Sequence, residues 1–167
     1  FKKADPEMML KMDTPFIAID YNCYLYALRN VMLEVTKELN TRFDGDKLRR
    51  KNEKLKSAIQ QNLWNEHDGW FYDADPRTMK LSNVRMLSAC SAMYAGVATK
   101  EQAERMVTHL SNKKEFATPW PCPSVSMDTP GVDPSLITYG GDIEITSGVW
   151  FTVEGLMRYG YRKLAAD

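Results

Sequence analysis

The sequence predicts an all-α protein made of antiparallel helical hairpins. Over most of the chain, apolar residues recur at steps of three and four, which is the spacing of one face of a helix. No segment shows the long alternation of apolar and polar residues that a half-buried strand needs. Turn and capping residues divide the helical pattern into consecutive segments, so we expect neighbouring helices to pair.

The first predicted helix covers residues 21–40. Charged residues fall outside its apolar stripe, so we expect the stripe to form the buried face. The stripe consists of Leu25, Leu28, Met32, Val35 and Leu39.

An Asp-Gly turn at 44–45 follows the first helix and predicts a helical hairpin. Asp46 is expected to cap the second helix, because an aspartate at this position can accept a hydrogen bond from a free backbone N–H. The apolar residues of this second helix are Leu48, Leu55, Ile59 and Leu63.

The segment "WNEHDGWFYDADPRTMK" contains two turn signals, at 68–69 and 75–76, around the aromatic run 70–72. We predict a loop or a small β-ribbon there. The next segment, 83–96, has small and apolar residues on most of its surface, so it is predicted to be a buried helix that ends at Gly96.

Thr99 and Gln102 have the spacing of a capping box, which predicts the start of a fourth helix. After a proline-rich segment, "FATPWPCPSVSMDTPGV", helical spacing resumes at about Ser147 and continues toward the end of the chain. No low-complexity segment interrupts the pattern, so the 167 residues are predicted to form a single helical domain, 1–167.

Composition narrows the classes of function. The chain is 44% hydrophobic and 26% charged, which is typical of a folded domain. Its 22 basic and 22 acidic residues cancel, so no positive excess favours nucleic acid or an anionic membrane surface as a partner. No run approaches the roughly twenty apolar residues of a membrane helix. A soluble protein with a neutral ligand is favoured, in either cytoplasm or periplasm.

Metal and disulfide chemistry have little support in the sequence. The three cysteines lack a C-x-x-C spacing and are expected to fill space in the core or in a loop. His67 and His109 have no partner at metal-ligand spacing. Asp73 and Asp75 precede Pro76 in a run that is shorter and less acidic than a calcium loop. We therefore expect no metal and no cofactor.

The irregular segments 12–22, 64–83 and 111–146 are rich in aromatic and acidic residues. If the helices alternate up and down, these segments emerge at one end, where loops carry function on a rigid scaffold. Aromatic faces beside carboxylates suit a sugar, because its C–H faces stack on rings while its hydroxyls bind Asp, Glu and Asn. The alternative is that the aromatic residues serve core packing. The candidate sugar-binding residues are Asp20, Asn22, Trp70, Tyr72, Asp73, Trp120, Asp142, Glu144 and Trp150.

These motifs resemble a known family in order along nearly the whole chain. "IDYNCYLYALRNVMLEVTKELN" is similar to the "P-V-D-L-N-x-x-L-Y" helix of trehalases and related inverting glycosidases. "NLWNEHDGWFYDAD" resembles their "L-W-D-x-x-x-G-x-Y-Y-D-x-D" segment, and "GVATKEQAERMVTHL" resembles the helix that follows. "FATPWPCPSVSMDTP" is similar to a proline loop of the mannosylglycerate hydrolase and processing α-glucosidase branch.

The resemblance implies an (α/α)6 toroid of six helical hairpins with a sugar site on one rim. The proline loop would be a rim segment that is stiff enough to meet substrate at little entropic cost. Asp20 and Asn22 would bind hydroxyls, and Trp70 and Trp120 would stack on the sugar.

Two departures from the family pattern matter. Where the branch carries "Y-W-R-G-P-V-W", this chain has "YGGDIEITSGVW", so Asp142 or Glu144 would supply an acidic group instead. The family's general acid and base lie in segments that this chain does not contain. The catalytic pair is therefore expected outside the chain, with Asp142 and Glu144 as secondary candidates, and the chain is expected to be a C-terminal part of a larger toroid.

The function predicted from the resemblance is inverting hydrolysis of an α-glycoside, with carbohydrate as substrate and the remainder of the toroid as partner. A non-catalytic carbohydrate-binding or helical-repeat module on the same fold is the main alternative. A lyase or phosphorylase on a related toroid is a further alternative.

Overall fold

The computed structural model describes residues 16–39, 44–119, 122–129 and 147–166. Among these residues the regular secondary structure is helical apart from one short antiparallel ribbon, so the all-α prediction is confirmed. The helices are α2 (Ile19–Glu38), α3 (Gly45–Asn62), α4 (Ser91–Tyr94), α5 (Lys100–Leu110), α6 (Ser147–Arg158) and α7 (Arg162–Ala166). A 3-10 turn, η1 (Leu87–Cys90), leads directly into α4.

The ribbon pairs β1 (Trp64–Asn65) with β2 (Trp70–Phe71), so that Trp64 lies opposite Phe71. It forms where the sequence predicted a loop or small β-ribbon. None of the described helices combines the length and apolarity that crossing a bilayer requires.

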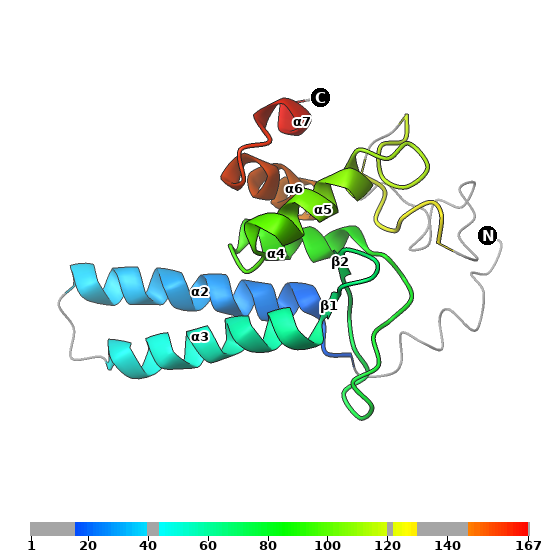
Figure 1. Ribbon diagram of the computed structural model, residues 1–167. Coiled ribbons are helices and arrows are strands. Elements are labelled where there is room, and N and C mark those ends of the chain that lie inside the picture. Colours follow the sequence, from blue (N-terminus) through cyan, green and yellow to red (C-terminus); the bar gives the residue numbers. More distant parts are fainter. Residues whose placement is uncertain (1–15, 40–43, 120–121, 130–146, 167) are drawn as a thin grey trace, which may run out of the picture.

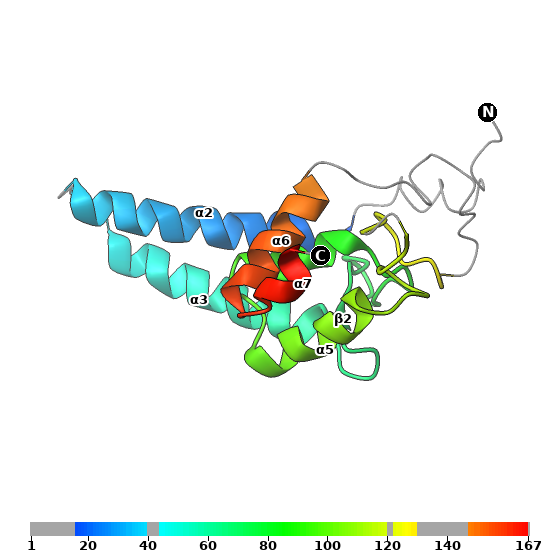
Figure 2. The same ribbon diagram turned by 90° about the horizontal axis from the view of Figure 1, so that it is seen from above.

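The long helices α2 and α3 lie side by side as a hairpin that projects from the rest of the molecule (Figures 1 and 2). The cap of α3 differs from the prediction. Asp44, rather than Asp46, is the N-cap, and its side chain accepts a hydrogen bond from the backbone N–H of Lys47 at 2.9 Å. Asp46 lies within the first turn and forms an exposed ion pair with Arg49 at 2.6 Å.

The face that α2 buries is not the predicted one. The helix turns Ile19, Cys23 and Tyr26 into the core. The predicted stripe, which includes Leu28 and Val35, is exposed in this structure. Since helical residues advance by about 100° per position, the two sets lie on opposite sides of α2. The helix therefore has two apolar faces, and periodicity alone could not tell which one faces this core.

The predicted helix at 83–96 is much shorter than expected. Residues 83–86 are not helical, and Met86 forms an isolated antiparallel bridge with Val125 in the proline-rich segment. Backbone pairing with that segment replaces the first helical turns. The end of the helix is as predicted, because Gly96 follows α4 with a φ of 73°.

The capping box of α5 is confirmed, since Thr99 and Gln102 each bind the other's backbone N–H. The last predicted helix begins at Ser147 as expected but is interrupted. Gly160 adopts a φ of 88° and separates α6 from α7.

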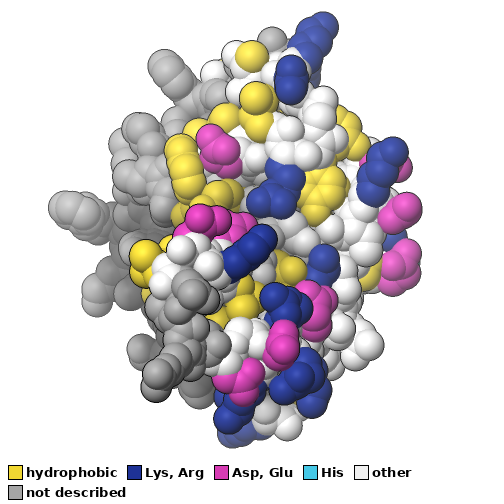
Figure 3. Space-filling view, turned by 90° about the vertical axis from the view of Figure 1, so that its left-hand side faces the viewer, with side chains coloured by type: hydrophobic (Ala, Val, Ile, Leu, Met, Phe, Trp, Pro, Cys, Tyr) yellow, Lys and Arg dark blue, Asp and Glu magenta, His cyan; other side chains and the backbone are white. Residues whose placement is uncertain are grey.

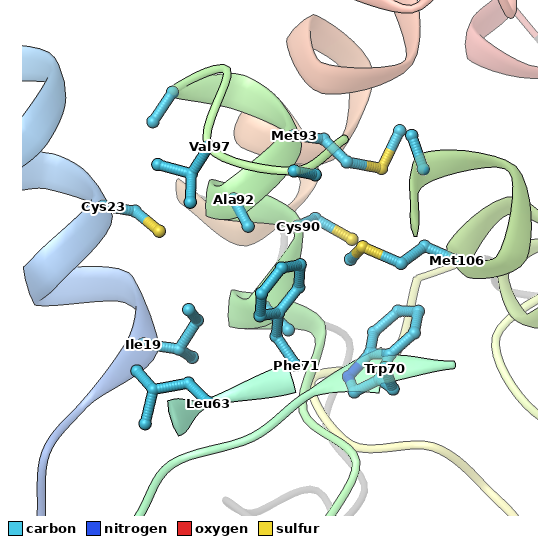
Figure 4. Packing of buried hydrophobic residues seen from close by; sticks show 14 of the residues in the cluster. Ile19, Cys23, Leu63, Trp70, Phe71, Cys90, Ala92, Met93, Val97 and Met106 are labelled. Carbon is cyan, nitrogen blue, oxygen red and sulfur yellow. The ribbon is translucent and has the colours of Figure 1, made fainter. Parts of the chain in front are cut away.

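The buried side chains form one cluster between α2, the ribbon, α4 and α5 (Figure 4). Trp70 and Phe71 of β2 occupy its centre together with Met93 and Met106. Cys23 and Cys90 are fully buried, as expected of filler, and burial raises the pKa of each thiol to about 12.

The short helix α4 links the first and last long helices, because it packs against both α2 and α6. Its contact with α6 is close at Gly155. A Cβ atom at that position would lie 2.8 Å from Cβ of Met93 and 3.1 Å from the backbone nitrogen of Tyr94. Glycine is therefore needed for the two helices to approach this closely.

Candidate sugar-binding site

The described parts of the irregular segments meet at one end of the helices. They are tied together by isolated backbone bridges from Ile17 to Ala74, from Ala74 to Leu81 and from Met86 to Val125. Figure 1 shows this end on the right, next to the beginning of α2. The chain thus brings distant segments to one place, as a binding site built from loops requires.

The proline-rich segment is fixed to this end at several points. The ring of Phe116 stacks on that of Trp70, with centroids 5.2 Å apart and planes at 19°. Further along, the backbone N–H of Leu87 donates to the carbonyl of Ser124, and that of Ser126 donates to the carbonyl of Arg85, both at 2.8 Å. The segment is therefore held by an aromatic stack and by backbone hydrogen bonds as well as by its prolines.

A buried carboxylate, that of Glu115, is the shared partner of several polar side chains next to this segment. Glu115 accepts hydrogen bonds from Arg85 at 3.1 Å, from Asn112 at 2.6 Å and from Nδ1 of His109 at 2.5 Å. Nε2 of His109 faces the backbone carbonyl of Asp68 at 2.8 Å. The two ring nitrogens of His109 thus face a carboxylate on one side and a backbone carbonyl on the other.

Asp68 and Tyr72 extend this network. The Tyr72 hydroxyl donates to Oδ2 of Asp68 at 3.1 Å. A hydrogen bond from His67, together with the one from Tyr72, holds the pKa of Asp68 below its usual value. Burial raises the pKa of Tyr72 to about 12, so this residue stays a neutral hydrogen-bond donor.

Asp73 caps α2 from a distant part of the sequence. The formal N-cap, Ala18, has no side chain that can do so, and Oδ1 of Asp73 accepts from the backbone N–H of Ile19 at 2.8 Å. Burial raises the pKa of the Asp73 carboxyl, the hydrogen bond from Ile19 opposes this shift, and the nearby charge of Asp20 adds to it. The geometry gives Asp73 a structural role at the start of α2.

We expect Asp73→Ala to lower the free energy of unfolding by roughly 0.5 to 2 kcal/mol, the usual cost of losing an N-cap. Asp73→Asn should cost less, because the amide oxygen can accept from Ile19. Urea unfolding at neutral pH measures both changes. Equal losses in the two variants would contradict the capping role.

A comparison of the unmodified protein with Asp73→Asn tests the sign of the pKa shift of Asp73. A carboxyl whose pKa is raised by folding favours the folded state below the pKa of the unfolded chain and loses this contribution as pH rises through the folded pKa. Relative to Asp73→Asn, which does not titrate, the unmodified protein should lose stability as pH rises through this acidic range.

Two other candidates lie on the first turn of α2 and are partly exposed. Oδ1 of Asp20 accepts from the backbone N–H of Tyr21 at 2.7 Å, and the amide of Asn22 donates to the carbonyl of Ala18 at 2.7 Å. These local hydrogen bonds orient both side chains at the end where the irregular segments meet.

The predicted residue Trp150 lies in a group of aromatic rings whose other members sequence reasoning did not single out. The ring of Tyr24 on α2 contacts that of Phe151 on α6, with centroids 4.7 Å apart. Phe151 in turn contacts Tyr94 and Trp150 at 4.7 and 4.9 Å. We call these four residues, Tyr24, Tyr94, Trp150 and Phe151, the aromatic cluster, and its Trp150 is 50% exposed. For Tyr24 and Phe151 the sequence signal was the aromatic content of "YNCYLY" and "VWF".

The structure corrects the role predicted for Trp70 and Tyr72. Trp70 has no exposed surface, donates from Nε1 to the carbonyl of Met86 at 3.2 Å and stacks on Phe116. Tyr72 is only 4% exposed. Neither side chain has a face available to a sugar, so the packing alternative holds for both.

The remaining candidates, Trp120, Asp142 and Glu144, lie outside the described residues. Among the residues that the structure does describe, no group of three or more His, Cys, Asp or Glu side chains could hold a metal ion. The candidates that remain among the described residues are the half-exposed Trp150 on α6 and the partly exposed Asp20 and Asn22 on α2. These groups can stack on a sugar ring and bind its hydroxyls.

The fold is that of the helical toroid glycosidases. Residues 3–167 match the model of the mannosylglycerate hydrolase MGH1-like glycoside hydrolase domain. The chain belongs to this family.

Solved structures show the same fold. The GH63 mannosylglycerate hydrolase of Thermus thermophilus, in complex with glucose, superposes with a TM-score of 0.78 and 18% sequence identity over 90% of this chain and 37% of that chain. The neutral trehalase of Saccharomyces cerevisiae gives a TM-score of 0.73 and 21% identity over 88% of this chain and 29% of that chain.

Among curated proteins, the periplasmic trehalase of Escherichia coli is 22% identical over 158 residues, which are 92% of this chain and 26% of that protein. The chain therefore spans about a quarter of the length of the curated relatives that it matches.

Proposed function

We propose that these residues are part of a glycoside hydrolase that cleaves an α-linked glycoside with inversion. The observation that carries the proposal is the family match over residues 3–167, combined with a helical fold shared with a mannosylglycerate hydrolase and a trehalase. Within the chain, the first turn of α2 and the aromatic cluster would supply part of the sugar-binding end. Its proposed contacts are Asp20, Asn22 and Trp150.

Each of these residues has a chemical task in the proposal. Trp150 offers an exposed ring face on which the C–H groups of a sugar can stack. The Asp20 carboxylate and the Asn22 amide, on one turn of α2, can accept from and donate to neighbouring hydroxyls. Because the aromatic cluster and local hydrogen bonds already orient them, binding costs little side-chain entropy.

Inverting hydrolysis needs one protonated carboxyl to donate to the leaving oxygen and one carboxylate to activate water on the opposite face of the sugar. The two groups lie roughly 6.5 to 9.5 Å apart in such enzymes. In our proposal both come from the remainder of the toroid, and this chain binds and orients the sugar between them.

The test is hydrolysis of α-linked disaccharides and α-linked glycosyl glycerates by the full-length protein that contains these residues. The first-formed anomer should be β when followed by NMR. Asp20→Asn should weaken transition-state binding by roughly 1.5 to 3 kcal/mol, the range for a hydrogen bond to a charged group. Asp46→Asn on the exposed side of α3 is the matched control and should leave kcat/KM unchanged.

A first-formed α anomer would overturn inversion. Sugar binding without turnover would favour the non-catalytic module. A product with a double bond would identify a lyase, and a sugar phosphate would identify a phosphorylase.

A further inference from the structure

The entry into α2 is held from outside the helix by the short segment that follows β2. Ile17 and Ala74 run antiparallel and exchange both backbone hydrogen bonds, at 2.8 and 3.2 Å. Ala74 also forms an antiparallel bridge with Leu81. The residue pair before α2 is therefore the outer member of a row of three paired segments.

Asp73 adds a side-chain contact to this backbone pairing. Its Oδ1 accepts from the backbone N–H of Ile19 at 2.8 Å, and its own carbonyl accepts from the N–H of Ser82 at 2.8 Å. The second hydrogen bond fixes the backbone of Asp73, and the first holds the start of α2 against it. Ala18 has no polar side chain, so the residue at the N-cap position cannot take over this role.

The backbone held in this way supports both proposed sugar contacts on α2. The carbonyl of Ala18 accepts from the Asn22 amide at 2.7 Å and from the Asn22 backbone N–H at 3.3 Å. Asp20 follows Ile19 directly, and its Oδ1 accepts from the N–H of Tyr21 at 2.7 Å. A helix end that loses its cap is the first part of the helix to open. Without the hydrogen bond to Ile19, both side chains would lose their fixed positions.

The start of α2 carries two carboxyl groups, those of Asp20 and Asp73. The macrodipole makes this end of the helix positive, which favours negative groups there. The two groups are close enough for the charge of Asp20 to contribute to the raised pKa of Asp73. On the face seen from the tip of the hairpin, by contrast, acidic and basic side chains are interspersed (Figure 3). The pair of carboxyl groups is thus a feature of the end of α2 that is proposed to meet the sugar.

We infer that Asp73 is a positioning residue of the proposed sugar-binding end, because it fixes the first turn of α2 and thereby the arrangement of Asp20 and Asn22. Asp73 itself touches no sugar and acts through these two residues. The inference rests on the proposed function. A cap that serves stability alone would leave the activity of the folded protein unchanged, so activity separates the two roles.

The test compares kcat/KM among full-length variants at a temperature at which every variant is folded. The substrate is the α-linked glycoside that the unmodified protein hydrolyses fastest. The usual cost of losing an N-cap corresponds to a roughly twofold to thirtyfold shift toward a frayed first turn. Asp73→Ala should lower kcat/KM by a factor within that range, mainly through a higher KM. Asp73→Asn should recover most of the loss, because its amide oxygen can accept from Ile19.

Asp75→Ala is the matched control. The Asp75 carboxylate accepts from the backbone N–H groups of Arg77 and Thr78 in its own turn, at 2.7 and 3.2 Å, so the change should leave kcat/KM unaltered. In an Asp20→Asn background, Asp73→Ala should cost less than in the unmodified protein, because Asp20 is one of the residues that Asp73 positions. An equal loss in both backgrounds would overturn the inference, as would an unchanged kcat/KM in Asp73→Ala.

Hydrogen exchange of the amides of residues 19–22 gives a second measurement that needs no substrate. Asp73→Ala should speed this exchange by roughly twofold to thirtyfold, and Asp75→Ala should not. Unchanged exchange in Asp73→Ala would also overturn the inference. If the full-length protein hydrolyses no α-linked glycoside, the proposed function fails, and the exchange rates still decide whether Asp73 fixes the first turn.

Discussion

Trp70→Ala is expected to lower the free energy of unfolding by about 3 to 5 kcal/mol, the range for removing a buried large aromatic side chain. The indole of Trp70 is fully buried, stacks on Phe116 and meets the His109 ring edge-on at 5.5 Å. Its removal leaves a cavity between β2 and the proline-rich segment and also frees the carbonyl of Met86. Urea unfolding followed by circular dichroism at 222 nm measures the loss.

Trp150→Ala is the matched control, because it removes the same side chain from a position that is 50% exposed. It should cost much less stability, and in the full-length protein it should weaken sugar binding. If the two variants lose equal stability, the assignment of Trp70 to the core and of Trp150 to the binding end would be wrong. Unchanged sugar binding in Trp150→Ala would contradict its proposed contact.

This difference between two tryptophans shows what could not be predicted from the sequence of the candidate site. Both lie in aromatic runs and have acidic residues nearby in the sequence. Whether a ring packs inward or faces solvent depends on the elements that approach it, here Phe116 for Trp70 and Tyr94 of α4 for Trp150. Composition identified segments rich in aromatic and acidic residues but could not assign the role of each ring.

The fold was predicted well wherever local interactions decide it. The capping box at Thr99 and Gln102 fixes the start of α5 through its own side chains, and Gly96 ends α4 with a positive φ. Prediction failed where a distant segment intervenes. Met86 pairs with Val125 and leaves the helical pattern, and Asp73 replaces a local cap on α2.

The faces of α2 illustrate a different limit. Periodicity correctly predicted an apolar stripe, yet the core uses the opposite side of the helix. Tyr26 and Cys23 pack inward, and the more strongly apolar line of leucines and valines remains exposed. A sequence pattern shows that a face is apolar, and the neighbouring elements determine what covers it.

The buried network around Glu115 had no sequence signal at all. Arg85 lies 30 residues before Glu115, and the two are brought together only because the proline-rich segment pairs with residues 85–87. Charged residues are common at this spacing in any chain, so their pairing becomes visible only in three dimensions.

Glu115→Gln is expected to lower the free energy of unfolding by about 3 kcal/mol, at the lower end of the cost of breaking a buried ion pair. The side chains of Arg85 and Glu115 are only 15% and 10% exposed, so the charge on Arg85 would lose its most buried partner and keep the half-exposed Asp128.

The matched control is Glu66→Gln. Glu66 forms an ion pair with Arg105 at 2.6 Å, and the Glu66 side chain is 83% exposed. That change should cost no more than about 1 kcal/mol. Urea unfolding of both variants gives the comparison, and proteolysis should cut the segment after Glu115 faster in Glu115→Gln than in the control. Similar losses for the two glutamates would mean that Arg85 is held without Glu115 and that prolines alone keep the segment in place.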